Sequence, residues 1–270
     1  MDRQEEKIEI VVNTRKTKNV KFYVYADDCR VDWGDGTSDF YNESALKTGD
    51  EDSIRAPKKP RCEHTYRGIN HVVTIVISGS AIVEFKIEHT PLTAIRCDNC
   101  YNLASIICPN CSLRQLHTGN TPNLLFINCI CNNLHKLDLS RCPSLLIIEC
   151  DCNYLSELNL SYCRRVSNII CRFNQLKKLR IADYPDTLHT VKCGYNNLPA
   201  KELNRLFQNL ALFFDRGHID YSLNPGTLFA DTSPLIAHDW TILNATTEKK
   251  VERILEDLNA AKDVLRTLLS

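Results

Sequence analysis

One spacing constrains this sequence more than any other feature, because leucines recur at a fixed interval through its central part. Each of these leucines is followed three residues later by a second apolar residue and, in most copies, two residues after that by a third. An LxxLxL pattern therefore recurs five times, with Thr118 as the polar exception at its last position, beginning at Leu92, Leu113, Leu134, Leu155 and Leu176. A constant repeat period of this kind indicates a repeat architecture, in which one short unit stacks on copies of itself.

Each unit has a second apolar half, which ends on a cysteine and then on an asparagine. The cysteine column comprises Cys108, Cys129, Cys150, Cys171 and Cys193. Three residues later stand Cys111, Asn132, Asn153, Asn174 and Asn196. Short strands with alternate residues pointing inward predict parallel coils about 4.8 Å apart around one core, with the asparagines hydrogen-bonded to turn backbone. We therefore predict a leucine-rich-repeat solenoid of five 21–22-residue coils over residues 91–198.

The coils resemble a known subclass of leucine-rich repeats. The segments LHKLDLSRCPSLLIIECDCNY and LSELNLSYCRRVSNIICRFNQ are similar to the 21-residue IRREKO type of bacterial proteins, in which both halves read LxxLxL or LxxLxC. The resemblance covers Leu92 to Leu198. It implies a repeat protein whose coils present a rigid surface.

Residues 1–90 show the alternation of β-strands instead, as in Ile8, Ile10 and Val12. Within VDWGDGT, the pair Asp35-Gly36 suits a tight hairpin turn, and Trp33 suits the core. Together with His64-Thr65-Tyr66, this segment resembles the PKD-type β-sandwich, although the polar stretch 43–61 is longer than that family usually has. The predicted fold class is mainly β with C-terminal helices: an N-terminal β-sandwich, then a leucine-rich-repeat solenoid with a helical cap.

The C-terminal part is expected to close the repeats. Residues 199–244 predict a capping coil, with a helix from Pro199 through Leu210 and a strand over Ile219–Leu223. Residues 245–270 predict an amphipathic helix, because apolar residues recur at 3–4 spacing over 248–269. This helix is expected either to pack against the cap or to self-associate with a second chain.

Charge and hydropathy exclude several function classes. Thirty-three basic residues balance thirty-three acidic ones, so we expect no nucleic-acid partner and no anionic membrane held by charge. No apolar run approaches the roughly 20 residues that span a bilayer, so no membrane insertion is expected. The start MDRQEEKIEI lacks the apolar region of a signal peptide, and we therefore expect a cytoplasmic location, although related proteins are often exported.

The fourteen cysteines allow two interpretations. Cys97, Cys100, Cys108 and Cys111 have the CxxC spacing of a zinc ribbon, which makes a zinc-binding or redox-responsive protein the alternative hypothesis. However, these residues also fall in the repeat columns, where thiols serve as small apolar core residues. We favour the second interpretation and predict no metal, no cofactor and a reducing compartment.

Catalysis receives little support from the sequence. No nucleophile elbow, phosphate-binding glycine loop or His-Glu-x-x-His motif is present, so we predict that the protein is not an enzyme. His117 and His135 fall near Asp138 on one coil face. Surface histidines often lie beside carboxylates without a catalytic role. Asp32 and Asp35 are better explained by the hairpin turn than by a calcium site.

The outward-facing strand positions favour binding. Four large apolar residues take such positions on successive second halves: Ile107, Phe126, Ile147 and Ile170. The first halves present charged or polar residues, namely Arg96, His117, Lys136, Asp138, Glu157, Lys178 and Arg180. An apolar patch with a polar margin is typical of a protein-contact surface, unless the cap or the 248–269 helix folds back over it. We therefore predict a non-catalytic protein–protein interaction module.

Overall fold

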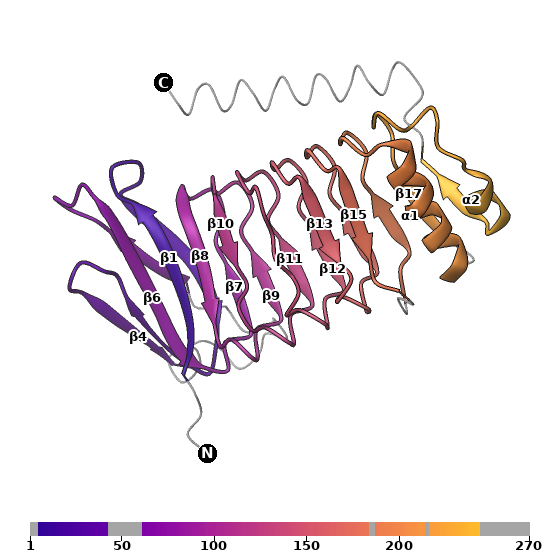
Figure 1. Ribbon diagram of the computed structural model, residues 1–270. Coiled ribbons are helices and arrows are strands. Elements are labelled where there is room, and N and C mark those ends of the chain that lie inside the picture. The colour runs from indigo at the N-terminus through magenta and orange to yellow at the C-terminus, as the bar shows by residue number, and fades with distance from the viewer. Residues whose placement is uncertain (1–4, 43–60, 184–186, 214–215, 244–270) are drawn as a thin grey trace, which may run out of the picture.

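The computed structural model describes residues 5–42, 61–183, 187–213 and 216–243. The chain forms an elongated stack of strands, which runs from the N-terminal sheets to helix α1 (Ala200–Phe213) near the other end (Figure 1). Within these ranges the one other helix is the short α2 (Ser233–Ala237). The prediction of a mainly β fold is confirmed.

The N-terminal part contributes strands to two sheets. Its strands are β1 (Glu6–Asn13), β2 (Asn19–Tyr25), β3 (Asp28–Asp32), β4 (Ser38–Asn42), β5 (Arg61–Thr65), β6 (Val72–Ser80) and β7 (Glu84–Lys86). One sheet contains the order β1-β6-β3-β4 and the other the order β7-β2-β5. The rings of Phe22 and Trp33 lie 5.5 Å apart and both are buried, so apolar groups from the two sheets share one core.

The VDWGDGT turn is held by side chains from a distant strand. His64 of β5 stacks on Trp33 at 4.8 Å, and its Nε2 lies 2.7 Å from the Asp35 carboxylate. The Tyr66 hydroxyl donates a hydrogen bond of 2.7 Å to the Trp33 carbonyl. Asp35 also accepts hydrogen bonds from the N–H and hydroxyl of Thr37. These contacts occupy the Asp35 carboxylate in the turn, as the turn interpretation predicts.

The second halves of the coils form a continuous parallel ladder. Its strands are β9 (Ser105–Ile107), β11 (Phe126–Asn128), β12 (Ile147–Glu149), β14 (Asn168–Ile170) and β16 (Thr190–Lys192). Phe126 pairs with Ile147, and Ile147 pairs with Asn168, so each residue is paired with the one a full repeat period further along the chain. The sequence period is thus the pairing register of the sheet.

The first halves pair less regularly. Their strands are β8 (Leu92–Asp98), β10 (Gln115–His117), β13 (Glu157–Leu160) and β15 (Lys178–Ile181). β10 pairs with β8, and β13 pairs with β15. The first half of the third coil forms no strand, and it pairs with β10 of the second coil through an isolated bridge between His117 and Asp138. All central residues of these segments are nevertheless buried.

The N-terminal sheets continue directly into the two ladders. β8 pairs antiparallel with β1, and β7 pairs with β2 on one side and with β9 on the other. Phe85 of β7 faces Ile106 of β9, again at the distance of one repeat period in the sequence, so the repeat register begins half a coil earlier than we predicted. The expected boundary at residue 90 lies within this continuous core.

The C-terminal coil replaces part of its first half with α1. β17 (Gly217–Asp220) pairs with β16, and β18 (Trp240–Ile242) pairs with β17, which extends the second-half ladder. Leu203, Leu206, Phe207 and Leu210 of α1 are buried, so the helix covers the end of the core. The predicted helix 248–269, with its possible self-association, lies outside the described residues.

Candidate interaction surface

The four apolar residues predicted to form the contact surface lie on four neighbouring strands of the second-half ladder. Phe126 and Ile147 pair directly, so their side chains lie side by side at the first position of β11 and β12. Ile107 and Ile170 occupy the third position of β9 and β14, diagonal to that pair. The four residues, which we name the Phe126 face, thus adjoin one another on the outward side of the sheet.

The Phe126 face is less exposed than expected, and it borders a polar pair. All four side chains are half-buried rather than exposed. The third residues of β11 and β12, which lie between Ile107 and Ile170, are Asn128 and Glu149. The Asn128 side-chain amide donates a hydrogen bond of 2.7 Å to the Glu149 carboxylate. Burial raises the pKa of Glu149 above its usual value. The apolar residues therefore surround a polar, hydrogen-bonded pair.

The charged residues of the first halves form a separate surface. His117, Lys136, Asp138, Glu157, Lys178 and Arg180 are exposed, as predicted. Arg96 is the exception, because β1 lies beside β8 and places Glu9 opposite it, with 3.8 Å between their charged groups. Ala94 is buried by the same strand. The N-terminal part thus covers the edge of this surface at the first coil.

The histidines do not assemble around Asp138. His117 adjoins Asp138 in the backbone bridge between two coils, whereas the His135 ring stacks on Tyr154 at 5.3 Å. The N–H of Ser140 donates to the Asp138 carboxylate and, with the Ser140 side chain, lowers the pKa of Asp138. This carboxylate is therefore occupied by its own turn.

The four cysteines with zinc-ribbon spacing are fully buried, and no cluster of three or more metal-binding side chains occurs among the described residues. A hydrogen bond with Cys100, together with burial, raises the pKa of Cys97 well above its usual value. Burial raises the pKa of Cys111 to about 11. The Cys111 thiol donates to the carbonyls of Ile87 and Pro109. These buried thiols thus take the positions in the core that the apolar-core interpretation assigns to them.

The sequence analysis missed an ion pair next to the Phe126 face. Asp151 is 5% exposed and follows β12 by two residues. It accepts hydrogen bonds from the Nε and Nη2 atoms of Arg172 at 3.0 and 2.7 Å, and from the Arg172 N–H. Burial raises the pKa of Asp151 despite this pairing. Asp151 and Arg172 are separated by one repeat period, so opposite charges at equivalent positions of consecutive coils were the signal that could have identified the pair.

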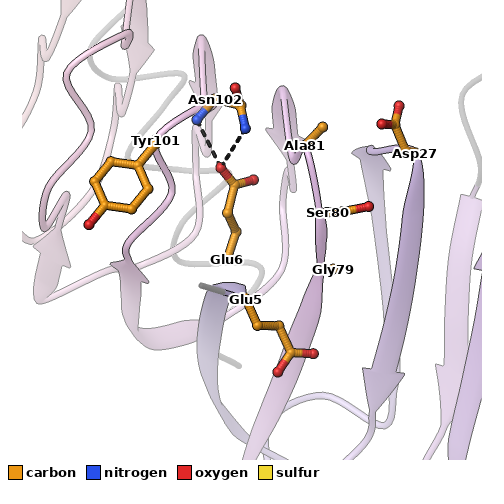
Figure 2. Close-up of a pocket in the computed structure, with 8 residues that line it drawn as sticks. All are labelled: Glu5, Glu6, Asp27, Gly79, Ser80, Ala81, Tyr101 and Asn102. Carbon is orange, nitrogen blue, oxygen red and sulfur yellow. Dashed lines mark hydrogen bonds between the residues drawn. The ribbon is translucent and has the colours of Figure 1, made fainter. Parts of the chain in front are cut away.

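A hollow of about 640 Å³ lies where the N-terminal sheets meet the coils. Figure 2 shows the Glu6 side chain pointing toward the turn that carries Tyr101 and Asn102. Glu6 is 3% exposed and accepts hydrogen bonds from the N–H and the side-chain amide of Asn102, both at 2.9 Å, and from the N–H of Ile82. The carboxylate therefore ties β1 to two turns, which is a structural role.

Comparisons with known proteins give little further information. No protein-family model matches the sequence, and a search of curated proteins found no match. A solved structure described as the functional domain of InlJ from Listeria monocytogenes, which includes a cysteine ladder, is similar to part of the chain. The two are 18% identical, the TM-score is 0.29, and the similarity covers 59% of this chain. It covers 49% of the InlJ chain, so this chain spans about half of that length.

Among the described residues, none of the helices is both long and apolar enough to cross a membrane.

Proposed function

We propose that this protein is a non-catalytic interaction module that binds a protein partner through a leucine-rich-repeat surface. The observation that carries the proposal is the Phe126 face, where four apolar side chains adjoin on neighbouring strands of one outward sheet surface. Large apolar side chains around a few polar groups are typical of the centre of a protein–protein contact.

The charged first-half surface supplies selectivity in this proposal. Lys136, Glu157 and Lys178 alternate in sign on successive coils and are exposed. Charges in the margin of a contact steer association and disfavour wrong partners more than they add affinity. A partner with complementary, alternating charge is therefore expected.

The proposal extends to the architecture and the location. We infer that residues 1–90 are a PKD-like β-sandwich and that the coils are of the 21-residue IRREKO type. The stacked Trp33 and His64 rings and the register of the second-half ladder support these assignments. The location that we propose is cytoplasmic, because side chains on neighbouring parallel strands rarely satisfy the torsion of a disulfide, and a chain with fourteen cysteines then suits a reducing compartment.

A matched pair of substitutions tests the binding face. Phe126→Asp is expected to abolish capture of a partner that the wild-type chain retains, because it places a charge at the centre of the apolar contact. Phe40→Asp is the control, since Phe40 is 65% exposed and belongs to β4, the edge strand of the other sheet. Partner capture is measured by affinity purification with each variant, and thermal unfolding is measured in parallel.

Partner capture and thermal unfolding together distinguish a partner site from a face that the chain itself covers. Loss of capture with an unchanged unfolding temperature supports a partner site. If Phe126→Asp instead lowers the unfolding temperature or the solubility while capture persists, the face is covered by the chain itself and the proposal fails.

A further inference from the structure

Two cysteines stand apart from the buried thiol columns. Cys131 is exposed and Cys152 is half-buried, whereas the other twelve cysteines are buried. They occupy the same position of consecutive coils, one repeat period apart, in the turn that follows each second-half strand. Both have positive backbone φ angles, 54° and 56°, as have Phe173 and Tyr195 at the equivalent positions of the next coils.

Side chains in this turn column touch their neighbours. The rings of Phe173 and Tyr195 stack with centroids 4.3 Å apart. The backbone keeps this coil-to-coil register at the cysteines. The Cys131 N–H donates to the Asp151 carbonyl, and the Cys152 N–H donates to the Arg172 carbonyl, both at 3.0 Å. Cys131 and Cys152 therefore occupy the same turn position on two adjacent, hydrogen-bonded coils. An accessible thiol therefore lies directly beside a second one.

We propose that Cys131 and Cys152 form a peroxide-reactive site, in which Cys131 is the attacking thiol and Cys152 the resolving thiol. An exposed cysteine next to a resolving partner is the arrangement that redox-sensitive cysteines share. This pair is distinct from the CxxC cysteines and from the buried column, which have no access to solvent.

The ionisation of the pair supports these roles. The hydrogen bond from Cys152 lowers the pKa of Cys131 to about 7, against the opposing effects of burial and of Asp151. The same contact raises the pKa of Cys152. Cys131 is therefore the more acidic thiol of the pair, whereas burial raises the pKa of Cys129, the residue that follows β11, to about 12.

The reaction balances with a hydroperoxide as the oxidant. The Cys131 thiolate attacks the terminal peroxide oxygen, so an S–O bond forms, the O–O bond breaks and the alcohol leaves with a proton. The Cys152 sulfur then attacks the Cys131 sulfenic acid, so the S–S bond forms and the S–O bond breaks, and water leaves with the Cys152 proton. Two thiols are thereby oxidised by two electrons, and one hydroperoxide gives one alcohol and one water.

The coil geometry favours a disulfide that is readily reduced. Neighbouring parallel chains lie about 4.8 Å apart, within the roughly 4.4–6.8 Å between Cα atoms that a disulfide spans. Side chains that project in parallel, however, do not favour the near-perpendicular torsion of a relaxed disulfide. Exposed and strained disulfides are the reversible ones, so two equivalents of a small thiol are expected to restore both cysteines.

Hydrogen peroxide provides the test on the intact, reduced chain. At neutral pH and low peroxide, the wild-type protein is expected to lose two titratable thiols and to yield a linkage between the tryptic peptides 115–136 and 142–164. Cys131→Ser is expected to lose thiols about tenfold more slowly, because the exposed thiol that attacks the peroxide is absent. Cys152→Ser is expected to accumulate a sulfenic acid at Cys131 that dimedone traps.

The control variant is Cys150→Ala, which removes a buried thiol from the same coil and should leave the reaction unchanged. The proposal is overturned if the wild-type chain keeps all its thiols under these conditions, or if Cys131→Ser reacts as fast as wild type. It is also overturned if the linkage persists in Cys152→Ser. Circular dichroism of each variant checks that it has the same secondary structure as the wild-type chain.

Discussion

At the scale of single residues, one buried asparagine connects each coil from the second onward to the coil before it. The Asn153 Oδ1 atom accepts the Leu134 N–H at 3.0 Å, and its Nδ2 donates to the carbonyls of Cys129, Cys150 and Asp151. The bond from a leucine N–H to the asparagine Oδ1 atom recurs at Asn132, Asn174, Asn196 and Asn224. Buried backbone groups require partners, so these amides satisfy turns that the parallel ladder leaves unpaired.

Removal of one amide from this column is expected to be costly. Asn153→Ala leaves the Leu134 N–H and at least one carbonyl buried without a partner, so we predict a loss of about 2–4 kcal/mol in the free energy of unfolding. Asn133→Ala is the control, since its side chain makes an exposed hydrogen bond to the Ser112 carbonyl. We expect it to cost less than about 1 kcal/mol. Urea unfolding measures both, and equal losses would contradict the role of the column.

Asp35 is expected to make stability depend on pH in acid. Burial raises its pKa, but hydrogen bonds from Thr37 and His64 outweigh that effect and lower the pKa below its usual value. A carboxyl with a folded pKa below the unfolded value of about 3.9 contributes stability above that pH and loses it as the pH falls through the folded pKa. The stability difference between wild type and Asp35→Asn should therefore be constant near neutral pH and shrink below about pH 4.

Chemical unfolding at a series of pH values measures this difference. Asp98→Asn is the matched control, because Asp98 is an exposed carboxylate at the end of β8, away from the turn. A difference for Asp35→Asn that stays constant down to about pH 2 would show that the carboxylate charge contributes nothing.

At the scale of elements, the sequence predicts those features of strands and helices that depend on the local spacing of apolar residues. The alternation of buried residues in β11, β12 and β14 follows directly from the spacing of Leu124, Ile127 and their counterparts, and helix α1 begins just after Pro199 as expected. The pairing of β8 with β1 joins segments that are far apart in the sequence, so no local pattern indicates that Arg96 is partly covered. The half-buried state of Phe126 likewise depends on how closely neighbouring coils pack.

Gly119 shows how closely the coils approach at a strand end. It follows β10 with φ of +58°, and a Cβ atom there would overlap the Cys97 carbonyl oxygen. Gly36, with φ of +89°, has open space around its position. We predict that Gly36→Ala costs about 1 kcal/mol through backbone conformation alone, whereas Gly119→Ala costs about 3 kcal/mol because β8 must also move. Thermal unfolding of the two variants compares them, and equal costs would show that the gap between β8 and β10 adapts freely.

At the scale of the whole molecule, the N-terminal part and the coils share two sheets and one core. β1 lies between β6 and β8, and β7 lies between β2 and β9, so both sheets pass from one part to the other without interruption. The buried residues of both parts belong to a single hydrophobic cluster. A stack of coils otherwise exposes its first core layer, and here the N-terminal sheets cover it.

This continuity predicts that the two parts unfold together. Ile10 of β1 is fully buried and pairs with Ile75 on one side and with Ile95 on the other. Ile10→Ala should lower the free energy of unfolding by about 2–4 kcal/mol and shift the whole calorimetric transition, because it weakens the strand that joins both parts. Val72→Ala, at a residue that is 54% exposed on β6, should leave the transition in place. If Ile10→Ala instead splits off an early transition while the main one stays fixed, the N-terminal sheets fold as an independent unit and the shared core contributes little to the stability of the coils.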